Sequence, residues 1–532
     1  MKKIVSLIEF KKIITKNPSR IILYGAGLHG EMIARALKKY GFRVSAFVDQ
    51  CEAVILKKSS EYDFITLNEL MENDYVIVTP EDVNSQREIE ALLRKYHIND
   101  FYYFDCNWKC YESLIACFGE EKKYNTIEEF EQEYKKFRQI QNDICVYMMW
   151  STRVGELIYR FMVMKEAFRK DANFYSIIIP KVELNADATL ANQRLMDIFG
   201  RYLNIVNKDN SEFWKNVFLW HGSEINTANS YYYDSYQEKK ISIWNSNYES
   251  KIELTKEELE EAERKCEKLG IKGEFVCIHA RDPYYLEHQY NYPTGFFNYH
   301  NYRDFSIHNF NKLANYLETK HTSVIRVGKG GKEKYFHRNV VDFAVDTYDE
   351  LLDLYLNSKC KYYIGTLTGA ANIPRLFCTK MITVNVADLV TSSFTIPFEK
   401  DEIFISKLYF SKSKNRYLSI KEMLYLDLKK YSIPRDDRPK SKMIQDIVYI
   451  ENTEEDILNT FIEADQRFRG IWIEDEEGTQ LQNAYLKVIE EFCQENPFFT
   501  YYKRDIRECI MPILMSTTFL KQHLFLIEEK LK

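Results

Sequence analysis

The sequence predicts a multidomain α/β protein, in which two successive Rossmann-like domains follow a small Rossmann-like domain and precede a helical C-terminal extension. Three observations predict this fold class. The chain of 532 residues is longer than one hydrophobic core usually serves. Buried-strand patterns alternate with helical patterns in three separate stretches. Several of the strands also run into turns rich in glycine or threonine, at the sheet edge where α/β proteins bind ligands.

Composition excludes several classes of protein. The net charge of −6 leaves no basic surplus for holding nucleic acid. The 11 cysteines are scattered, without paired zinc-site spacings, which favours a reducing compartment and no structural metal. The N-terminus lacks the apolar core of a signal peptide, and no apolar stretch reaches membrane-spanning length. We therefore expect a cytoplasmic protein, with peripheral association at the inner membrane face and homo-oligomerisation left open.

The N-terminal domain, residues 1–118, opens with a strand, a glycine turn and a helix. The strand RIILY (20–24) leads into Gly25, Gly27 and Gly30 and then the helix EMIARALKKY. A second strand ends at Asp49, about 20 residues after the turn, where a Rossmann unit places its ribose-binding carboxylate. A strand at 75–80, a helix at 84–95 and a strand at 101–105 complete half of a doubly wound sheet. Gly25, Gly27, Gly30 and Asp49 form a candidate nucleotide-binding site. A purely structural role for the glycines stays equally open.

Two further α/β patterns follow a charged helical linker at 119–142. The middle domain, 143–265, begins with a strand at 144–150, a loop at 151–156 and a helix from Leu157, and continues to a strand at 175–180. A capping box at Thr255 and Glu258 begins the helix that stops at Gly270. The next domain, 270–390, has strands at 274–282, 323–328 and 381–386 and helices at 306–320 and 348–359. Residues 391–532 are expected to be mostly helical.

The first group of candidate site residues is His279 to Asp282, at the end of a predicted buried strand. Arg281 offers a permanently charged fork that suits a diphosphate, and its charge would stabilise a leaving nucleotide without a metal ion. His279 is expected nearby. The alternative is a local ion pair between Arg281 and Asp282.

Three other groups complete the candidate site. The second group, His300 to Asp304, precedes a predicted helix, where side chains such as Arg303 and the helix amides would converge on an anion, or it forms a solvated loop. The turn GTLTGAAN offers hydroxyls and amides for a pyrophosphate, or forms a helix cap without a ligand. Glu156, in the first loop of the middle domain, is the candidate base for an acceptor hydroxyl, or the acid that favours a helix N-terminus. The predicted donor-binding residues are Arg153, Gly155, Arg303, Arg326, Thr366, Thr368 and Gly369.

Common metal and hydrolase motifs are missing from the sequence. No predicted strand is followed by the Asp-x-Asp pair that holds a cation at a sugar diphosphate, so we expect no metal. There is also no GxSxG, HExxH or Walker A motif.

Four blocks, VCIHARDPYY, HNYRDFSIHNFNKLANYL, SVIRVGKGGKE and KYYIGTLTGAANIPRLF, resemble the signature of a bacterial glycosyltransferase family of surface-polysaccharide gene clusters. The resemblance covers about residues 143–465. That family is distantly similar to the protein O-fucosyltransferases, of the two-Rossmann GT-B type, whose HxR motif and R-x-G-x loop contact donor and acceptor. Here these are His279 with Arg281, and Arg153 with Gly155 and Glu156. Ala280 and Asp282 depart from the fucosyltransferase pattern, which leaves the donor sugar open. Residues 20–107 resemble the N-terminal domain of sugar acyltransferases.

The resemblance implies metal-independent, inverting transfer from a nucleotide sugar to a glycan or lipid-linked glycan. Arg281 would bind the diphosphate and Glu156 would act as base. Two alternatives stay open. One is an NAD-dependent sugar-modifying enzyme that uses the glycine turn and Asp49, and the other is a non-catalytic carbohydrate-binding scaffold.

Overall fold

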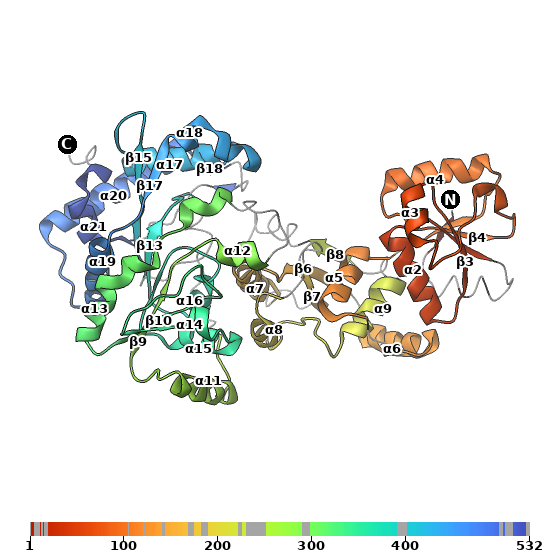
Figure 1. The fold of residues 1–532 in the computed structure, drawn as a ribbon, viewed down its shortest axis with the longest axis horizontal. Helices are drawn as coiled ribbons and strands as arrows, with labels where there is room; N and C mark the ends of the chain where they lie inside the picture. Colours follow the sequence, from red (N-terminus) through yellow and green to blue (C-terminus); the bar gives the residue numbers. More distant parts are fainter. Residues whose placement is uncertain are drawn as a thin grey trace. The chain divides into compact units, whose positions relative to one another are not determined.

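The chain forms two compact units, shown in the computed structural model of Figure 1. The structure describes residues 2–4, 11, 14, 20–104, 106–120, 123–140, 144–168, 175–181, 190–221, 226–229, 252–289, 298–390, 402–499, 504–505 and 514–527. Unit 1 comprises Met1–Trp150, Phe168–Leu184 and Phe199–Tyr233, and unit 2 comprises Ser151–Ala167, Asn185–Ile198 and Asp234–Lys532. None of the helices built from described residues is long and apolar enough to cross a lipid bilayer.

The first sheet of unit 1 has five parallel strands in the order β1-β5-β4-β2-β3. The predicted strands and the helix at 84–95 are present. The strand order reverses at β2, whose neighbours are β3 and β4. A ligand crevice can form at such a reversal point. The three-residue edge strand β1 was not predicted, because so short a run shows no alternation. The elements are β1 (Lys2–Ile4), β2 (Ile21–Tyr24), α2 (Leu28–Lys39), β3 (Val44–Val48), α3 (Glu52–Lys58), η1 (Leu67–Glu69), β4 (Tyr75–Val78), α4 (Val83–Lys95) and β5 (Phe101–Phe104).

The second sheet of unit 1 has the parallel order β7-β6-β8, and a bridge between Ile178 and Ile205 extends it beyond β7. In chain order these strands read three, two, one, four, which is the order of half a Rossmann sheet. The predicted linker helix is not a free connection, because Ile127, Phe130 and Tyr134 on one face of it are buried in the core of unit 1. The elements are α5 (Trp108–Phe118), α6 (Ile127–Ile140), β6 (Ile144–Trp150), β7 (Tyr175–Lys181), α9 (Ser211–His221) and β8 (Asn226–Asn229).

Unit 2 contains a seven-stranded parallel sheet with the order β11-β10-β9-β12-β13-β14-β20. In chain order this reads three, two, one, four, five, six, seven, which is the Rossmann order with one added strand. The order reverses between β9 and β12. The strands are β9 (Phe275–His279), β10 (Ser323–Arg326), β11 (Val340–Asp342), β12 (Tyr363–Gly365), β13 (Met381–Val386), β14 (Glu402–Ser406) and β20 (Leu514–Met515).

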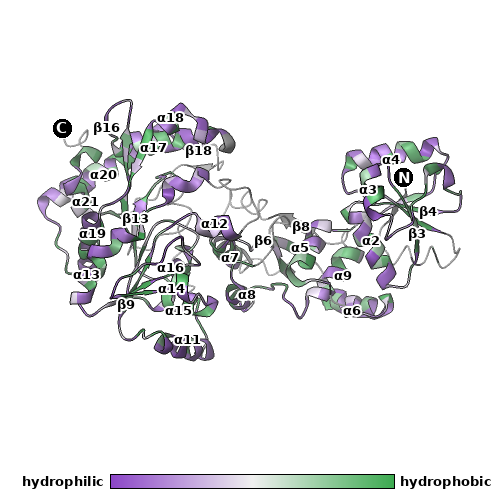
Figure 2. Ribbon diagram, in the orientation of Figure 1, coloured by the Kyte–Doolittle hydropathy of each residue, from purple (hydrophilic) through white to green (hydrophobic). Residues whose placement is uncertain are grey.

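Helices cover the large sheet. Helix α11 begins at the predicted capping box, since Thr255 and Glu258 each bond the other's backbone amide. It buries only Ala262 and Cys266 and is mainly hydrophilic (Figure 2). The first helices of unit 2 are α7 (Val154–Phe168), α8 (Gln193–Phe199), α11 (Lys256–Lys268), α12 (Tyr284–Gln289), η3 (Asn298–Arg303), η4 (Ile307–Phe310), α13 (Asn311–Thr319), α14 (Phe343–Asp346), α15 (Glu350–Lys359) and α16 (Asn372–Leu376).

The C-terminal region, expected to be mostly helical, also supplies strands. β14 and β20 join the large sheet, and a small antiparallel sheet adds three more strands in the order β16-β15-β17. These strands have two to five residues, too few for a clear periodicity. The remaining elements are β15 (Leu408–Ser411), β16 (Arg416–Tyr417), α17 (Ile420–Lys430), η5 (Arg435–Lys440), α18 (Lys442–Gln445), β17 (Ile447–Ile450), α19 (Glu454–Phe468), α20 (Glu476–Glu495), β18 (Phe498–Phe499), β19 (Arg504–Asp505), α21 (Thr517–Gln522) and η7 (Leu524–Leu526).

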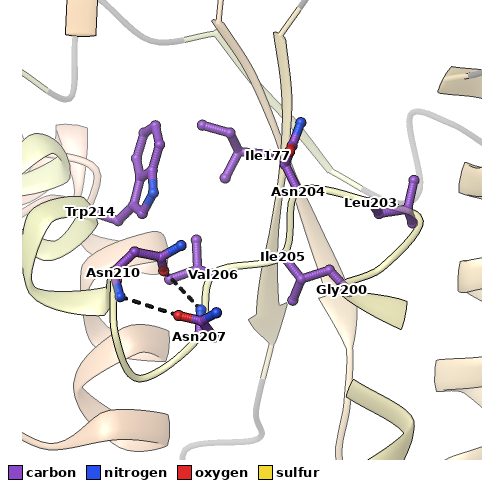
Figure 3. A pocket seen from close by; sticks show the side chains of 9 residues that line it. All are labelled: Ile177, Gly200, Leu203, Asn204, Ile205, Val206, Asn207, Asn210 and Trp214. Atoms are coloured by element: carbon purple, nitrogen blue, oxygen red, sulfur yellow. Dashed lines mark hydrogen bonds between the residues drawn. The ribbon is translucent and has the colours of Figure 1, made fainter. Parts of the chain in front are cut away.

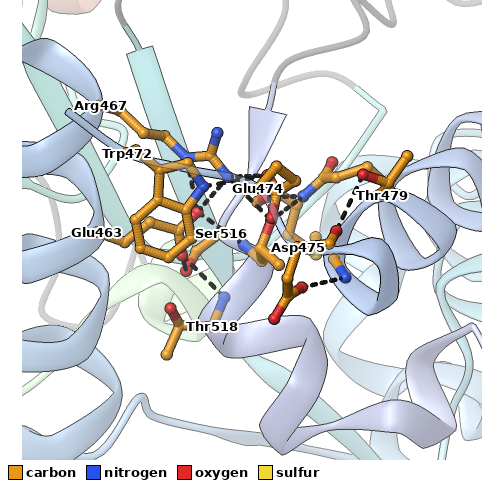
Figure 4. A network of polar contacts seen from close by, with 12 residues as sticks. Glu463, Arg467, Trp472, Glu474, Asp475, Thr479, Ser516 and Thr518 are labelled. Atoms are coloured by element: carbon orange, nitrogen blue, oxygen red, sulfur yellow. Dashed lines mark hydrogen bonds and ion pairs between the residues drawn. The ribbon is translucent and has the colours of Figure 1, made fainter. Parts of the chain in front are cut away.

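A buried carboxylate joins the last segment of the chain to the rest of unit 2 (Figure 4). Glu463 on α19 is fully buried. It accepts hydrogen bonds from the amides of Thr517 and Thr518, at 3.0 and 2.8 Å, and from the Ser516 hydroxyl at 2.6 Å. Arg467 adds a charge-assisted bond at 2.8 Å. Glu463 therefore caps α21 and holds β20 in place at the edge of the sheet.

Candidate functional site

The reversal point of the large sheet brings the first and third predicted groups together. β9 and β12 are neighbours, and His279 pairs with Gly365 at their carboxyl ends. A side chain at Gly365 would lie 2.8 Å from the His279 carbonyl oxygen, so the two strand ends touch through backbone. The turns that follow, Ala280 to Asp282 and Thr366 to Gly369, therefore leave the same edge side by side, where open α/β sheets bind ligands.

Two arginines lie at this edge. Arg281 is 8% exposed, forms an ion pair with Asp304 and donates from Nη1 to the His300 carbonyl at 3.3 Å. The ion-pair partner is thus Asp304, from the second predicted group. Arg303 donates to the carbonyl of Leu367, in the turn after β12. Burial, and next the positive charge of Arg303, lower the pKa of Arg281 to about 10. Two guanidinium groups close enough to repel one another favour an anion between them.

A third cation, Lys407, was not predicted from the sequence. It follows β14 directly, is 2% exposed and donates from Nζ to the carbonyl oxygen of Asp304. Burial lowers the pKa of Lys407 to about 8, with Glu451 opposing the shift and Arg281 adding to it. The only signal for it in the sequence is a lysine after a short apolar run, and the strand order was needed to place that run at this edge.

His279 is held as a neutral ring. Its Nδ1 lies 3.0 Å from the Val327 carbonyl oxygen, which only accepts, so Nδ1 carries the proton. Gly328, at φ +114°, leaves room for the ring, since a side chain there would lie 2.9 Å from Nδ1. Burial lowers the pKa of His279 to about 4. The ring therefore presents Nε2 as a hydrogen-bond acceptor at neutral pH and is not a cation.

The turn after β12 differs from the predicted helix-dipole site. Helix α16 has only five residues, so its dipole is short. Thr366 is buried and donates to the Asn385 carbonyl at 3.4 Å. The hydroxyl oxygen of Thr368 is buried and bonds no atom of the described residues. Buried hydroxyls are normally satisfied, so Thr368 is the member of this turn whose hydroxyl, as far as the described residues show, is available to a ligand.

The loop that carries Glu156 packs against the same turn. A side chain at Gly155 would come within 2.5 Å of the Gly369 Cα, and Asn372 donates from Nδ2 to the Gly155 carbonyl at 3.1 Å. Both predicted glycines are thus explained by one close backbone contact. Glu156 is exposed in the first turn of α7, 3.7 Å from Arg160, and Arg153 is half-buried before it. The predicted base therefore stands beside the predicted phosphate turn.

Arg326 supports the loop after β10. It is 3% exposed and donates to Asp342 at 3.0 Å and to the Glu333 carbonyl at 2.7 Å. Its other terminal nitrogen lies 3.8 Å from Asp282, whose Oδ2 accepts from the Lys332 amide at 3.0 Å. The guanidinium of Arg326 is therefore engaged by groups of the protein. Asp282 lies beside Arg326 and the Lys332 amide, which is why it is not the partner of Arg281.

Among the described residues no cluster of three His, Cys, Asp or Glu side chains is arranged to hold a metal ion.

The fold was compared with those of solved protein structures. Solved structures similar to this chain include glycosyltransferases. ADP-heptose LPS heptosyltransferase II of E. coli is 8% identical and aligns over 62% of this chain and 99% of its own, with a TM-score of 0.37. An iron-containing dodecameric glycosyltransferase of enterotoxigenic E. coli is 10% identical over 61% and 77%, with a TM-score of 0.33. A family 9 glycosyl transferase of Veillonella parvula is 12% identical over 50% and 86%, with a TM-score of 0.31. No protein-family model and no curated protein matches the sequence. Because these TM-scores are low, the fold is assigned here from the strand order of the sheets and not from similarity to these structures.

The predicted residues of the N-terminal domain surround the first turn of its sheet. Asp49 accepts from the Ala26 amide at 2.7 Å and from the Cys51 amide at 2.8 Å, so both carboxylate oxygens brace the turn. Gly25 has φ +106°, and a side chain at Gly30 would lie 2.0 Å from the Gly25 carbonyl oxygen. Gly27 differs, because a side chain there would meet no atom within 4 Å. Gly25 and Gly30 are required by the backbone, whereas local packing does not require Gly27.

A pocket of about 200 Å³ lies elsewhere in unit 1 (Figure 3). Asn207 and Asn210 each accept from the other's backbone amide, at 3.2 and 2.9 Å, and close the turn before α9. Their amide oxygens are therefore engaged by the turn. The residues that line the pocket are Ile177, Gly200, Leu203, Asn204, Ile205, Val206, Asn207, Asn210 and Trp214, none of which belongs to the predicted site.

Proposed function

We propose that this protein is a glycosyltransferase that binds the diphosphate of a nucleotide sugar at the edge between β9 and β12 of unit 2. The observation that carries the proposal is the convergence of Arg281 and Arg303 there, at the reversal point of a Rossmann-ordered sheet. Lys407 adds a third positive charge, bonded to the carbonyl oxygen of Asp304. An oxyanion of the ligand would pair with these cations and accept from the Thr368 hydroxyl.

The proposed chemistry is direct displacement at the anomeric carbon of the donor sugar. A hydroxyl oxygen of the acceptor forms the new glycosidic bond while the bond from the anomeric carbon to the diphosphate oxygen breaks. The bonding electrons leave with the nucleoside diphosphate, whose growing charge Arg281 and Arg303 stabilise. Glu156 takes the proton of the acceptor hydroxyl. Backside attack of this kind inverts the anomeric centre, and no step requires a metal ion.

His279 has a separate role in this proposal. A neutral imidazole with a free acceptor nitrogen orients a hydroxyl of the donor or acceptor, and its low pKa keeps the ring uncharged beside Arg281. The close contact between Gly155 and Gly369 keeps the Glu156 loop beside the diphosphate turn. Base and leaving group are thus held by neighbouring backbone segments.

Several finer assignments belong to the same proposal. The half-Rossmann order of the sheet that contains β6 supports a GT-B pair of domains, with 143–265 on the acceptor side and 270–390 on the donor side. The sequence blocks described above favour a glycan or lipid-linked glycan acceptor in surface-polysaccharide synthesis. We also propose that the N-terminal domain binds a nucleotide. Local packing does not require a glycine at position 27, which leaves close approach of a ligand as a reason for it.

A thermal-shift screen with ADP, GDP, UDP and their sugar conjugates tests the proposal, because a ligand that binds only the folded protein raises its melting temperature. We expect stabilisation by one nucleoside diphosphate, lost in Arg281→Ala. Arg338→Ala is the matched control, since this arginine of unit 2 is largely exposed and contacts only Glu318 among the described residues. Stabilisation that survives in Arg281→Ala, or that NADH alone produces, would overturn the proposal.

A further inference from the structure

A buried charged cluster lies at the carboxyl end of β13, two strands from His279. Its centre is Asp388, which is fully buried and has φ +76°, a backbone conformation that aspartate tolerates better than most residues. Oδ2 of Asp388 lies 3.1 Å from Nζ of Lys430 and accepts from the Tyr302 hydroxyl at 3.2 Å. The Tyr431 hydroxyl donates to the same oxygen. Three donors from two distant segments therefore meet on one carboxylate oxygen.

Helix α17 supplies the charge that balances this carboxylate. Lys430 is the last residue of α17, is buried, and lies 3.4 Å from Asp427 as well. Asp427 accepts from the Leu389 amide at 2.7 Å and from the Tyr409 hydroxyl at 3.1 Å. Nζ of Lys430 also lies 4.3 Å from the centre of the Tyr302 ring. The desolvation of Asp388 and Lys430 on burial offsets much of their Coulombic attraction. A contribution to stability alone therefore does not account for this ion pair.

The cluster reaches the proposed diphosphate site through one residue. Tyr302 and Arg303 are consecutive in η3, so bonding of the Tyr302 hydroxyl to Asp388 fixes the backbone from which Arg303 extends. Arg303 then meets the Leu367 carbonyl in the turn after β12. The segment before η3, residues 290–297, is outside the described residues. Asp388 is therefore a side-chain anchor of η3 within the described chain, beside the Arg281 contact with the His300 carbonyl.

We propose that Asp388 and Lys430 are positioning residues, which hold Arg303 toward the donor diphosphate through the Tyr302 hydroxyl. This makes α17, in the C-terminal region, a functional part of the donor site. The inference rests on the proposed function, because it assigns a partner to Arg303 in that site. A positioned guanidinium loses less conformational entropy when it binds, so the anchor increases affinity without touching the ligand.

Tyr302→Phe tests this with the smallest change, since it removes the hydroxyl and keeps the ring beside Lys430. Inorganic pyrophosphate is the probe, because every nucleotide-sugar donor shares the diphosphate. In calorimetric titrations of the full chain, we expect Tyr302→Phe to weaken pyrophosphate binding about tenfold, as for loss of a hydrogen bond to a charged group. Tyr431→Phe is the matched control. It removes a phenol bond to the same Asp388 oxygen, but from the residue that caps the C-terminus of α17 and not from η3, and should change affinity by less than about twofold.

A double-mutant cycle separates positioning from a general loss of structure. If Tyr302 acts through Arg303, then Tyr302→Phe has no further effect on pyrophosphate affinity in an Arg303→Met background, although any loss of thermal stability persists there. Equal weakening in both backgrounds would overturn the inference, as would wild-type affinity in Tyr302→Phe. Failure of the proposed function looks different: the wild-type protein would not bind pyrophosphate, or Arg281→Ala would bind it unchanged.

Discussion

Adding one methyl group at Gly155 tests whether the Glu156 loop and the diphosphate turn form one site. In Gly155→Ala the new Cβ would lie 2.5 Å from the Gly369 Cα, whereas carbon atoms in contact lie 3.5 to 4.0 Å apart. The obstructing atom is backbone, so a shift of about 1 Å must move a whole segment. Overpacking of this kind costs about 1 to 3 kcal/mol of unfolding free energy. A 1 Å displacement of a catalytic group also lowers the rate by about 100-fold.

Two measurements check this prediction. Chemical denaturation gives the stability of unit 2, and slow hydrolysis of the donor identified in the nucleotide screen gives the rate. Gly27→Ala is the control, because a side chain at Gly27 meets no atom within 4 Å and its φ is negative. The loss of the glycine N-cap of α2 opposes the gain from a less flexible unfolded chain, so its unfolding free energy should stay within about 1 kcal/mol of the wild-type value. Wild-type stability and hydrolysis in Gly155→Ala would refute the close contact and with it the placement of Glu156.

Three further predictions concern buried polar groups. Glu463→Gln should destabilise unit 2 by about 3 kcal/mol in denaturant titrations, because the buried carboxylate that caps α21 is lost; Glu455→Gln on the same helix, exposed and paired with Lys312, should change little. Binding of the nucleoside diphosphate identified in the screen should weaken above pH 8, since the Lys407 pKa of about 8 means that the free protein loses this proton and binding must restore it. The affinity of Lys407→Met should be weaker at pH 7 and nearly level from pH 7 to 9; a wild-type slope in that variant would assign the titration elsewhere. Thr368→Val should weaken the same ligand, whereas unchanged calorimetric affinity would show that the buried hydroxyl has no role in binding.

Strong local patterns were sufficient for much of the secondary structure. The capping box at Thr255 begins α11 as predicted, and the apolar run MITVNV forms β13. Helix α2 begins at Leu28, three residues before the predicted start, because Gly27 serves as its N-cap without a side-chain bond. The strands β1, β14 and β20 were missed, since strands of two to five residues carry little signal of their own.

The sequence by itself determined which residues lie at the carboxyl ends of strands. Because the ends of parallel strands share one sheet edge, these residues were expected at one site. The sequence placed His279, Arg281 and the turn from Thr366 to Gly369 at such ends. Only the tertiary structure decided which strand ends are neighbours, and therefore that Arg281 pairs with Asp304, 23 residues on, and that Lys407 joins them. Charge and burial at a site depend on groups brought together by strand order, which local periodicity does not encode.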